Sequence, residues 1–200
     1  APFFIGETEV SNRQFSRFVA AQGNRYELSR EFWSRKAREV LEGASGPRSS
    51  DWVLGECQEE RLDDPVRGIT WLEVEAYAKW AALSVPGRSE WLVAAFWDFA
   101  QSRAQPFPWG AGPLRDGMLR AGGKEGQTSV ASEESTNAAT PTGLRHVLGN
   151  VWELVLDRSS GKWIRVGGSF NTALEAFSAD SERFRAYIRG EPQRESGFWP

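Results

Sequence analysis

The sequence predicts an α+β fold in which helices come first and short strands follow. Two stretches in the first half of the chain combine a helix-start signal with apolar residues at helical spacing. From Gln101 to His146 the chain is rich in Gly, Pro, Ser and Thr, and short strand-like pieces come after it. Strands and helices do not alternate regularly, so we do not expect a parallel sheet built from βαβ units.

Both early helices are expected to begin with a capping box. In "EVSNRQFSRFV" the side chain of Ser11 can accept a backbone hydrogen bond, and Gln14 can reach back to the cap. Thr70 and Glu73 repeat this spacing in "GITWLEVEAYAKWAAL". In both stretches an apolar residue also precedes the cap, as in a hydrophobic staple. These signals predict helices that start after Ser11 and after Thr70.

The remaining elements are less regular. A third helix is predicted over residues 89–100, after the turn signal at Pro86 and Gly87. Between the first two helices the chain is mixed, and only "REFWSRKAREVLEG" is compatible with another helix. The strand-like pieces are "NVWELVLD", "KWIRVGG" and "RFRAYI". No repeat and no linker interrupts the chain, so residues 1–200 are expected to form one domain.

Composition and charge exclude several classes of protein. A chain of 200 residues with 40% hydrophobic and 26% charged residues is ordinary for a globular protein. Its net charge of −3 gives no general attraction to nucleic acid or to an anionic membrane. No apolar run reaches the roughly 18 residues of a membrane helix, and no signal peptide is visible. A cytoplasmic location is therefore favoured.

The chain has one cysteine, Cys57, and one histidine, His146. These counts exclude an internal disulfide and a zinc site built from Cys and His, which needs about four ligands. Cys57 lies in the acidic run "GECQEE", where neighbouring carboxylates disfavour the thiolate. The sequence has no nucleophile-elbow motif whose serine His146 could activate as a general base. We therefore expect no catalytic residue, no metal site and no cofactor.

Seven short motifs occur in an order that resembles one known family. They are "ETEVSNRQFSRF", "DDPVRGITWLEVEAYAKW", "VPGRSEWLVAA", "FPWG", "TPTGLRHVLGNVWEL", "RVGGSF" and "SGFW". Together they resemble the formylglycine-generating enzyme (sulfatase-modifying factor) family over nearly the whole chain. The resemblance implies a variant of the C-type lectin fold, mixed α/β with little regular secondary structure. It also accounts for the long irregular segment in the middle of the chain.

The same resemblance bears on catalysis. Active enzymes of this kind oxidise a substrate cysteine with two cysteines near the C-terminus that bind copper(I), a metal that soft thiolates suit. The matching positions fall in "SERFRAY" and hold Ser181 and Ala186. Related iron enzymes use several histidine ligands, and this chain has one. The sequence therefore predicts that the chain is not an enzyme.

A non-catalytic binding domain is the function predicted on this basis. Variable proteins of diversity-generating retroelements use the same fold to display a C-terminal segment, which here corresponds to residues 168–199. Core packing is the alternative role for Phe177 and Phe184. The candidate ligand-binding residues are Asn171, Thr172, Leu174, Glu175, Phe177, Asp180, Glu182, Phe184 and Tyr187.

The expected partner is a protein or a small-molecule ligand, bound by a monomer. Arginines near the C-terminus are interleaved with acidic residues, which cancel most of the positive electrostatic potential that would attract nucleic acid. A mixture of Arg, acid and aromatic residues suits a recognition surface better. Two alternatives remain open. One is an oxidase or oxygenase relative with altered chemistry, and the other is the sensor module of a signalling protein.

Overall fold

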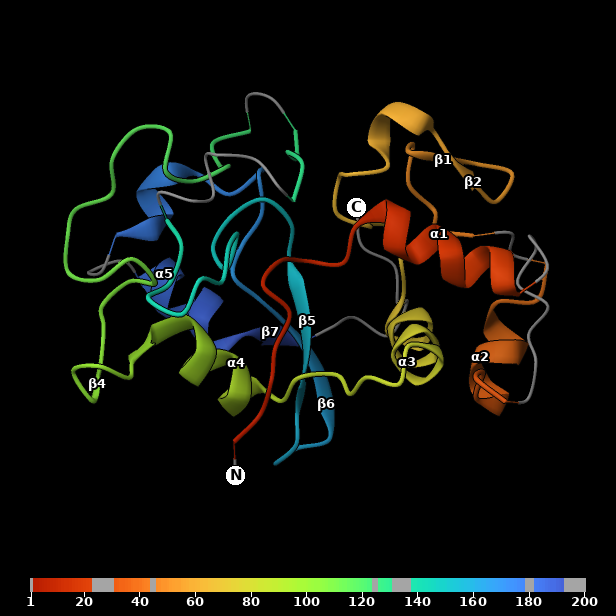
Figure 1. Ribbon diagram of the computed structural model, residues 1–200, viewed down its shortest axis with the longest axis horizontal. Helices are drawn as coiled ribbons and strands as arrows, with labels where there is room; N and C mark the ends of the chain where they lie inside the picture. Colours follow the sequence, from red (N-terminus) through yellow and green to blue (C-terminus); the bar gives the residue numbers. More distant parts are fainter. Residues whose placement is uncertain are drawn as a thin grey trace. The chain divides into compact units, whose positions relative to one another are not determined.

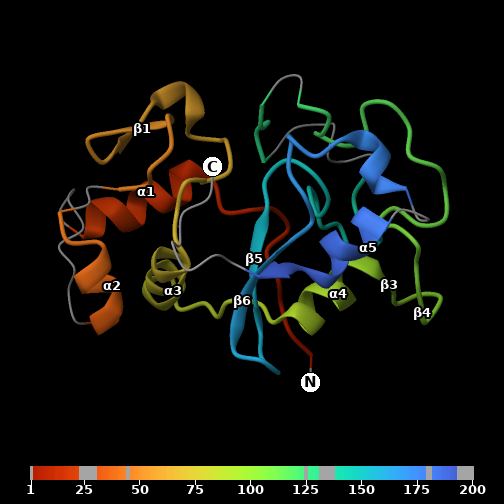
Figure 2. The same ribbon diagram turned by 180° about the vertical axis from the view of Figure 1, so that it is seen from behind.

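The computed structural model describes most of the chain and divides it into two compact units. Unit 1 consists of Ala1–Glu9 and Pro86–Gln193, and unit 2 consists of Val10–Val85 and Arg194–Pro200. Figures 1 and 2 show the elements of both units from opposite sides. The described residues are 2–22, 31–43, 46–123, 126–130, 138–178 and 182–192.

Unit 2 contains the predicted early helices, and both capping boxes are confirmed. The Ser11 hydroxyl accepts a hydrogen bond from the Gln14 amide, and the Ser11 amide donates to the Gln14 side-chain oxygen. Thr70 and Glu73 make the same two bonds. Its elements are α1 (Asn12–Ala21), α2 (Arg35–Val40), β1 (Trp52–Val53), β2 (Glu56–Cys57), the 3-10 helix η1 (Glu59–Arg61) and α3 (Trp71–Trp80).

A polar contact fixes the aromatic core of unit 2. Asn12 is fully buried, and its Oδ1 accepts a hydrogen bond of 2.8 Å from the Trp52 indole. Its Nδ2 donates to the Arg61 carbonyl at 2.9 Å. One side chain therefore joins α1 to the β1–β2 hairpin and to η1. The buried core around it is made of Phe15, Phe18, Val19, Trp33, Ala37, Leu41, Trp52, Leu72 and Ala76.

Unit 1 is built around a three-stranded antiparallel sheet in the order β5-β6-β7. Val155 pairs with Ile164 at its centre, and Arg165 pairs with Glu191. The elements of the unit are α4 (Arg88–Phe96), β3 (Trp97–Asp98), β4 (Arg103–Ala104), β5 (Glu153–Asp157), β6 (Lys162–Val166), the 3-10 helix η3 (Leu174–Phe177), α5 (Glu182–Arg189) and β7 (Glu191–Pro192).

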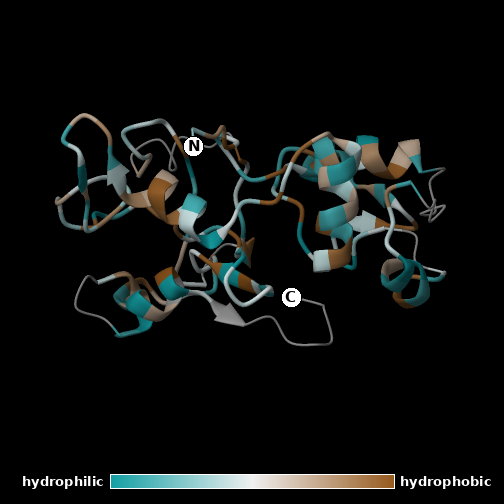
Figure 3. Ribbon diagram, turned by 90° about the horizontal axis from the view of Figure 1, so that it is seen from below, coloured by the Kyte–Doolittle hydropathy of each residue, from teal (hydrophilic) through white to brown (hydrophobic). Residues whose placement is uncertain are grey.

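The core of unit 1 draws on segments far apart in the chain. Its buried residues are Trp91, Ala95, Phe96, Phe107, Val147, Leu148, Val155, Ile164, Val166, Phe177 and Phe184. Figure 3 shows hydrophobic and hydrophilic residues on the same helices, as expected where one face is buried. Residues 105–123, 126–130 and 138–152 contain no regular helix or strand. Backbone contacts and buried side chains therefore hold this long segment in place.

Two predicted elements were wrong in type or extent. "RFRAYI" forms helix α5, because Phe184 and Ile188 are one helical turn apart and both pack against the core of unit 1. The predicted helix 89–100 ends at Phe96, since Trp97 and Asp98 pair with β4 as a hairpin. The mixed α and β class with little regular secondary structure is confirmed, and the C-type lectin topology stays a prediction. Within the described residues, no helix combines the length and the apolar character needed to cross a membrane.

Candidate functional site

The predicted ligand-binding segment begins at a sharp bend made by two glycines. Gly167 and Gly168 have backbone φ values of +87° and +83°, which residues other than glycine rarely adopt. A Cβ at Gly167 would lie 2.7 Å from the Val147 carbonyl oxygen, and one at Gly168 would lie 2.9 Å from Cζ of Phe177. Both positions therefore lack room for a side chain, in agreement with the tight strand bend that the sequence indicates.

A short hydrogen-bonded turn follows the bend. The Ser169 amide donates to Thr172 Oγ1 at 2.9 Å, and the Thr172 amide donates to the Ser169 carbonyl at 2.9 Å. From the neighbouring loop, the amides of Gly122 and Gly123 donate to the carbonyls of Thr172 and Phe170 at 2.8 and 2.7 Å. Four hydrogen bonds donated by backbone amides thus hold the turn, so the backbone that carries its side chains is fixed in position.

The candidate residues divide between surface and core. Thr172, Phe177 and Phe184 are buried, and the two phenylalanines are 1% and 3% exposed. They pack in unit 1 and support the segment, so core packing, the alternative considered for both rings, describes their position. Asp180 and the side chain of Tyr187 lie outside the described residues. The exposed candidates are Asn171, Leu174, Glu175 and Glu182.

Asn150 connects this segment to two others. It is fully buried with a φ of +51°, and its carbonyl accepts a hydrogen bond of 2.7 Å from Phe170. Its side-chain oxygen accepts from the Thr128 amide at 2.8 Å. Its Nδ2 donates to Glu9 Oε1 at 3.1 Å and to the Thr128 carbonyl at 3.3 Å. The side chain and the backbone carbonyl of Asn150 therefore together join the N-terminal segment to the candidate site.

Two carboxyl groups lie next to this network. Trp91 Nε1 donates to Glu153 Oε2 at 3.1 Å, but burial outweighs that bond and raises the pKa of Glu153 to about 8. Burial, and then the charge of Glu153, also raise the pKa of Glu9 well above its usual value. Oε2 of Glu9 is buried and has no hydrogen-bond partner among the described residues. At neutral pH Glu153 therefore favours its protonated form, and the pKa of Glu9 is shifted in the same direction.

Sequence reasoning missed the role of Glu9. The signal was present as two carboxylates in separate motifs, "ETEVS" and "GNVWEL", but their spacing of more than 140 residues hides the contact. The motif that contains Asn150 and Glu153 is marked in the sequence only by the family resemblance. No sequence pattern marks Glu9 as part of a site.

His146 and Cys57, the side chains best suited to catalysis by their chemistry, lie in environments that disfavour their reactive forms. His146 is buried with a φ of +55°, and desolvation, followed by the charge of Arg145, lowers its pKa to about 4. Burial, followed by the charges of Asp51, Asp64 and Glu60, raises the pKa of Cys57 to about 11. The described residues contain no group of three or more His, Cys, Asp or Glu placed to bind a metal ion.

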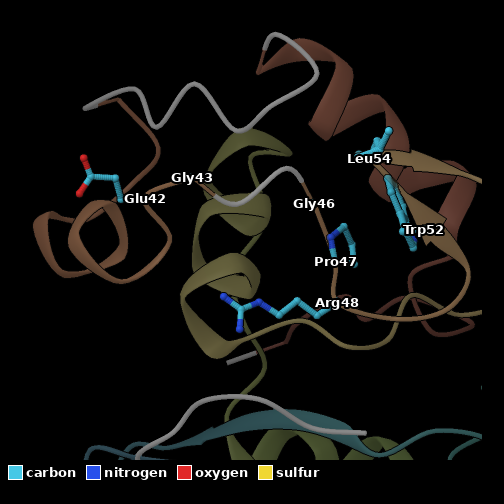
Figure 4. A pocket seen from close by; sticks show the side chains of 8 residues that line it. Glu42, Gly43, Gly46, Pro47, Arg48, Trp52 and Leu54 are labelled. Carbon is cyan, nitrogen blue, oxygen red and sulfur yellow. The ribbon is translucent and has the colours of Figure 1, made fainter.

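Unit 2 has a separate hollow of about 310 Å³. Figure 4 shows Glu42 on one side of it, with Trp52 and Leu54 on the other. None of the predicted ligand-binding residues lines it. The lining residues are Glu42, Gly43, Gly46, Pro47, Arg48, Trp52, Leu54 and Gly55.

Comparison with known proteins identifies the family. Residues 1–198 match the sulfatase-modifying factor enzyme 1-like domain, the FGE-sulfatase family. The chain belongs to this family. The FGE-sulfatase match extends over both units and includes the motifs on which the resemblance rests, apart from the last residue of "SGFW".

Relatives of this FGE-sulfatase domain are named as enzymes. It is 31% identical to formylglycine-generating enzyme of Thermomonospora curvata, over 82% of this chain and 62% of that protein. It is 29% identical to hercynine oxygenase of Mycolicibacterium thermoresistibile, over 76% of this chain and 34% of that protein. It is 25% identical to inactive C-alpha-formylglycine-generating enzyme 2 of Bos taurus, over 76% and 58%. The chain thus spans less than two thirds of each relative.

These names correct one prediction. The expectation that the chain is not an enzyme was wrong, because relatives at about 30% identity are named formylglycine-generating enzyme and hercynine oxygenase. The FGE-sulfatase family is an enzyme family, although at least one relative is named inactive. The prediction had inferred a lack of activity from the absence of the cysteine pair and of several histidines.

Proposed function

We propose that this chain is the substrate-binding domain of an oxidising enzyme, with residues 168–192 forming its ligand surface. The observation that carries the proposal is the family match over residues 1–198, with relatives named for generating formylglycine and for oxygenating hercynine. Fold alone does not define a reaction. The proposal therefore also depends on a surface able to hold a substrate.

The exposed residues of the segment offer such a surface. Asn171 supplies an amide that can donate and accept, Leu174 an apolar contact, and Glu175 a negative charge. Asn171 lies on the turn that the Gly122 and Gly123 amides hold in place, and Leu174 and Glu175 lie at the start of η3, directly after it. Side chains on a rigidly held loop are well suited to binding, because little conformational entropy is lost when the ligand binds. A small polar substrate or a peptide, bound by a monomer in a C-type lectin fold, fits these groups.

Diversification of the same surface is a second candidate. Variable proteins of diversity-generating retroelements change exposed residues on a constant scaffold, and Asn171, Leu174, Glu175 and Glu182 are exposed here. The test is the genomic neighbourhood. A near-repeat of the DNA encoding residues 168–199, differing at adenines and next to a reverse transcriptase, is the expected finding. Without such a repeat the diversified version is wrong and the constant substrate surface stands.

Oxygen uptake tests the main proposal. The native protein that carries this chain is supplied with hercynine or with a cysteine-containing peptide, and uptake is measured with an oxygen electrode. We expect uptake that depends on one of these substrates. The Glu175→Ala variant should raise KM, whereas Glu56→Ala, which removes an exposed carboxylate of unit 2, should not. Uptake that neither substrate changes, or a KM equally raised by both variants, contradicts the proposal.

A further inference from the structure

We infer that the tip of the β1–β2 hairpin in unit 2 pairs reversibly with a second copy of this chain, by inserting Leu54 into the hollow beside the same tip of that copy. Leu54 and Gly55 alone join the two strands, because Val53 pairs with Glu56. The inference is independent of the proposed function. The substrate surface lies in unit 1 and needs one copy only, so a monomer binds the substrate, and pairing is a further property that emerges as the concentration rises.

Leu54 is an unusual residue for this turn. Leu54 and Gly55 have φ values of +52° and +89°, and a type I′ turn requires positive values at both positions. Glycine and asparagine adopt such values readily, whereas a leucine is strained there. The side chain of Leu54 is also 86% exposed, and that of Val53 is 59% exposed. Strain and exposure both disfavour a leucine in the isolated chain, so a contact with another molecule is the best explanation for it.

The hollow next to this tip is already formed. Its buried wall consists of Gly46, Pro47, Trp52 and Gly55. A Cβ at Gly46 would lie 3.2 Å from Cα of Gly55, so the two backbones are in close contact and the loop is held against the hairpin. A Cβ at Gly43 meets nothing within 4 Å, which leaves this side of the hollow open. With a volume of about 310 Å³ and an indole in its wall, the hollow can hold a leucine side chain.

Shape and charge identify a second copy as the partner. Leu54 itself borders the hollow, so each copy presents a projecting side chain next to a space that can receive one (Figure 4). A two-fold interface joins the same patch of both copies, and each residue pair in it forms twice. Glu42 and Arg48 are exposed on the rim of the hollow and carry opposite charges. In a two-fold pair Glu42 of one copy faces Arg48 of the other, so the patch is complementary to itself.

The pairing should be weak. Two apolar residues and one hollow per copy form a patch well below the roughly 1,200 Å² that stable interfaces bury, so we expect a Kd of about 10 to 100 µM. Sedimentation velocity of the native protein that carries this chain, at concentrations below and above this range, measures the equilibrium. A protein that stays monomeric at every concentration overturns the inference.

Leu54→Asn tests the contribution of the exposed leucine, because it removes the apolar side chain and creates the Asn-Gly pair that this turn prefers. We expect Kd to rise by about a hundredfold or more, since two leucines per dimer lose their burial. The midpoint of urea unfolding should rise as strain is relieved. Leu83→Asn is the matched control, because Leu83 is an exposed leucine of unit 2 that does not line the hollow, and it should leave Kd unchanged. Unchanged dimerisation of Leu54→Asn, or a loss of stability that places Leu54 in contact with its own chain, overturns the inference.

Charge reversal tests whether the partner is a second copy. Glu42→Arg and Arg48→Glu each place like charges opposite one another, so each variant alone should dimerise about tenfold more weakly. An equal mixture of the two variants should pair again, because one copy then carries two positive charges on the rim and the other two negative ones. Arg17→Glu, which alters a second hollow of about 380 Å³, is the control and should have no effect. A mixture that does not pair, or equal weakening by Arg17→Glu, overturns the inference.

Discussion

Asn150 Nδ2 donates a hydrogen bond of 3.1 Å to Glu9 Oε1, joining two residues 141 positions apart in the chain. The same asparagine accepts from Thr128 and presents its carbonyl to Phe170, the second residue after the glycine bend. The buried Asn150 thus connects the N-terminal segment, the irregular middle of the chain and the candidate site, the first two through its side chain and the third through its backbone carbonyl. This residue therefore holds three segments of unit 1 together.

Replacing Asn150 should destabilise the protein strongly. Asn150→Ala removes the hydrogen bonds of the side chain and leaves buried partners unsatisfied, so we expect a loss of about 3 kcal/mol in the free energy of unfolding. Asn150→Gly is the matched control, because it removes the same bonds but tolerates the φ of +51°. It should be less damaging by about 1 kcal/mol. Urea unfolding at pH 7 measures both, and equal losses would show that the backbone conformation contributes nothing.

Stability should fall as pH rises through the range in which Glu153 loses its proton. Folding raises the pKa of Glu153 from 4.5 to about 8, so between these values the folded protein binds more protons than the unfolded chain. The free energy of unfolding should therefore decrease with increasing pH, by up to about 1.4 kcal/mol per unit. Glu9 acts in the same direction.

The Glu153→Gln variant isolates this effect, because its amide oxygen can still accept from Trp91. We expect a flatter pH profile than that of the wild type between pH 5 and 8. His146 has the opposite influence at lower pH, since folding lowers its pKa from 6.5 to about 4 and stability is lost as pH falls. Comparing the two profiles cancels that contribution. Parallel profiles would mean that Glu153 ionises normally in the folded state.

The glycine bend gives a third prediction. Gly167→Ala would place a Cβ 2.7 Å from a backbone oxygen at a φ of +87°. Gly143 has a similar φ of +92°, but a Cβ there meets nothing within 4 Å. Gly143→Ala should therefore cost only the backbone strain, about 1 kcal/mol, and Gly167→Ala about 3 kcal/mol or more. Thermal or urea unfolding distinguishes them, and a similar cost at both sites would contradict the close approach at the bend.

Thr172 tests the turn itself. Thr172→Val keeps the shape of the buried side chain but removes the oxygen that accepts from the Ser169 amide, so about 1 to 3 kcal/mol should be lost. Thr172→Ser retains an oxygen and should recover most of that loss. Hydrogen exchange at the Ser169 amide should accelerate in the valine variant alone. Unchanged exchange there would mean that the hydroxyl does not hold the turn.

Local signals predicted the parts of the fold that depend on neighbours in sequence. Ser11 with Gln14 and Thr70 with Glu73 form the expected capping boxes, because both partners lie within one helical turn. The same local reasoning failed for "RFRAYI". Its residues alternate enough to suggest a strand, but packing of Phe184 and Ile188 against the core of unit 1 selects a helix.

The site was only partly predictable for a related reason. The glycine bend at Gly167 and Gly168 and the exposed residues after it follow from a contiguous motif. The contact between Glu9 and Asn150 depends on chain topology, and no spacing rule brings those positions together. The burial of Phe177 and Phe184 likewise depends on segments from elsewhere in unit 1.

Hydrogen exchange of the native protein, measured with and without hercynine or a cysteine-containing peptide, locates the substrate surface. If residues 168–192 form the substrate surface, amide exchange should slow in peptides that cover the turn at Ser169–Thr172 and the exposed residues Leu174 and Glu175. Peptides from the hollow around Glu42 and Arg48 should be unaffected. Protection confined to that hollow, with no change after Gly168, would contradict the assignment of the substrate surface.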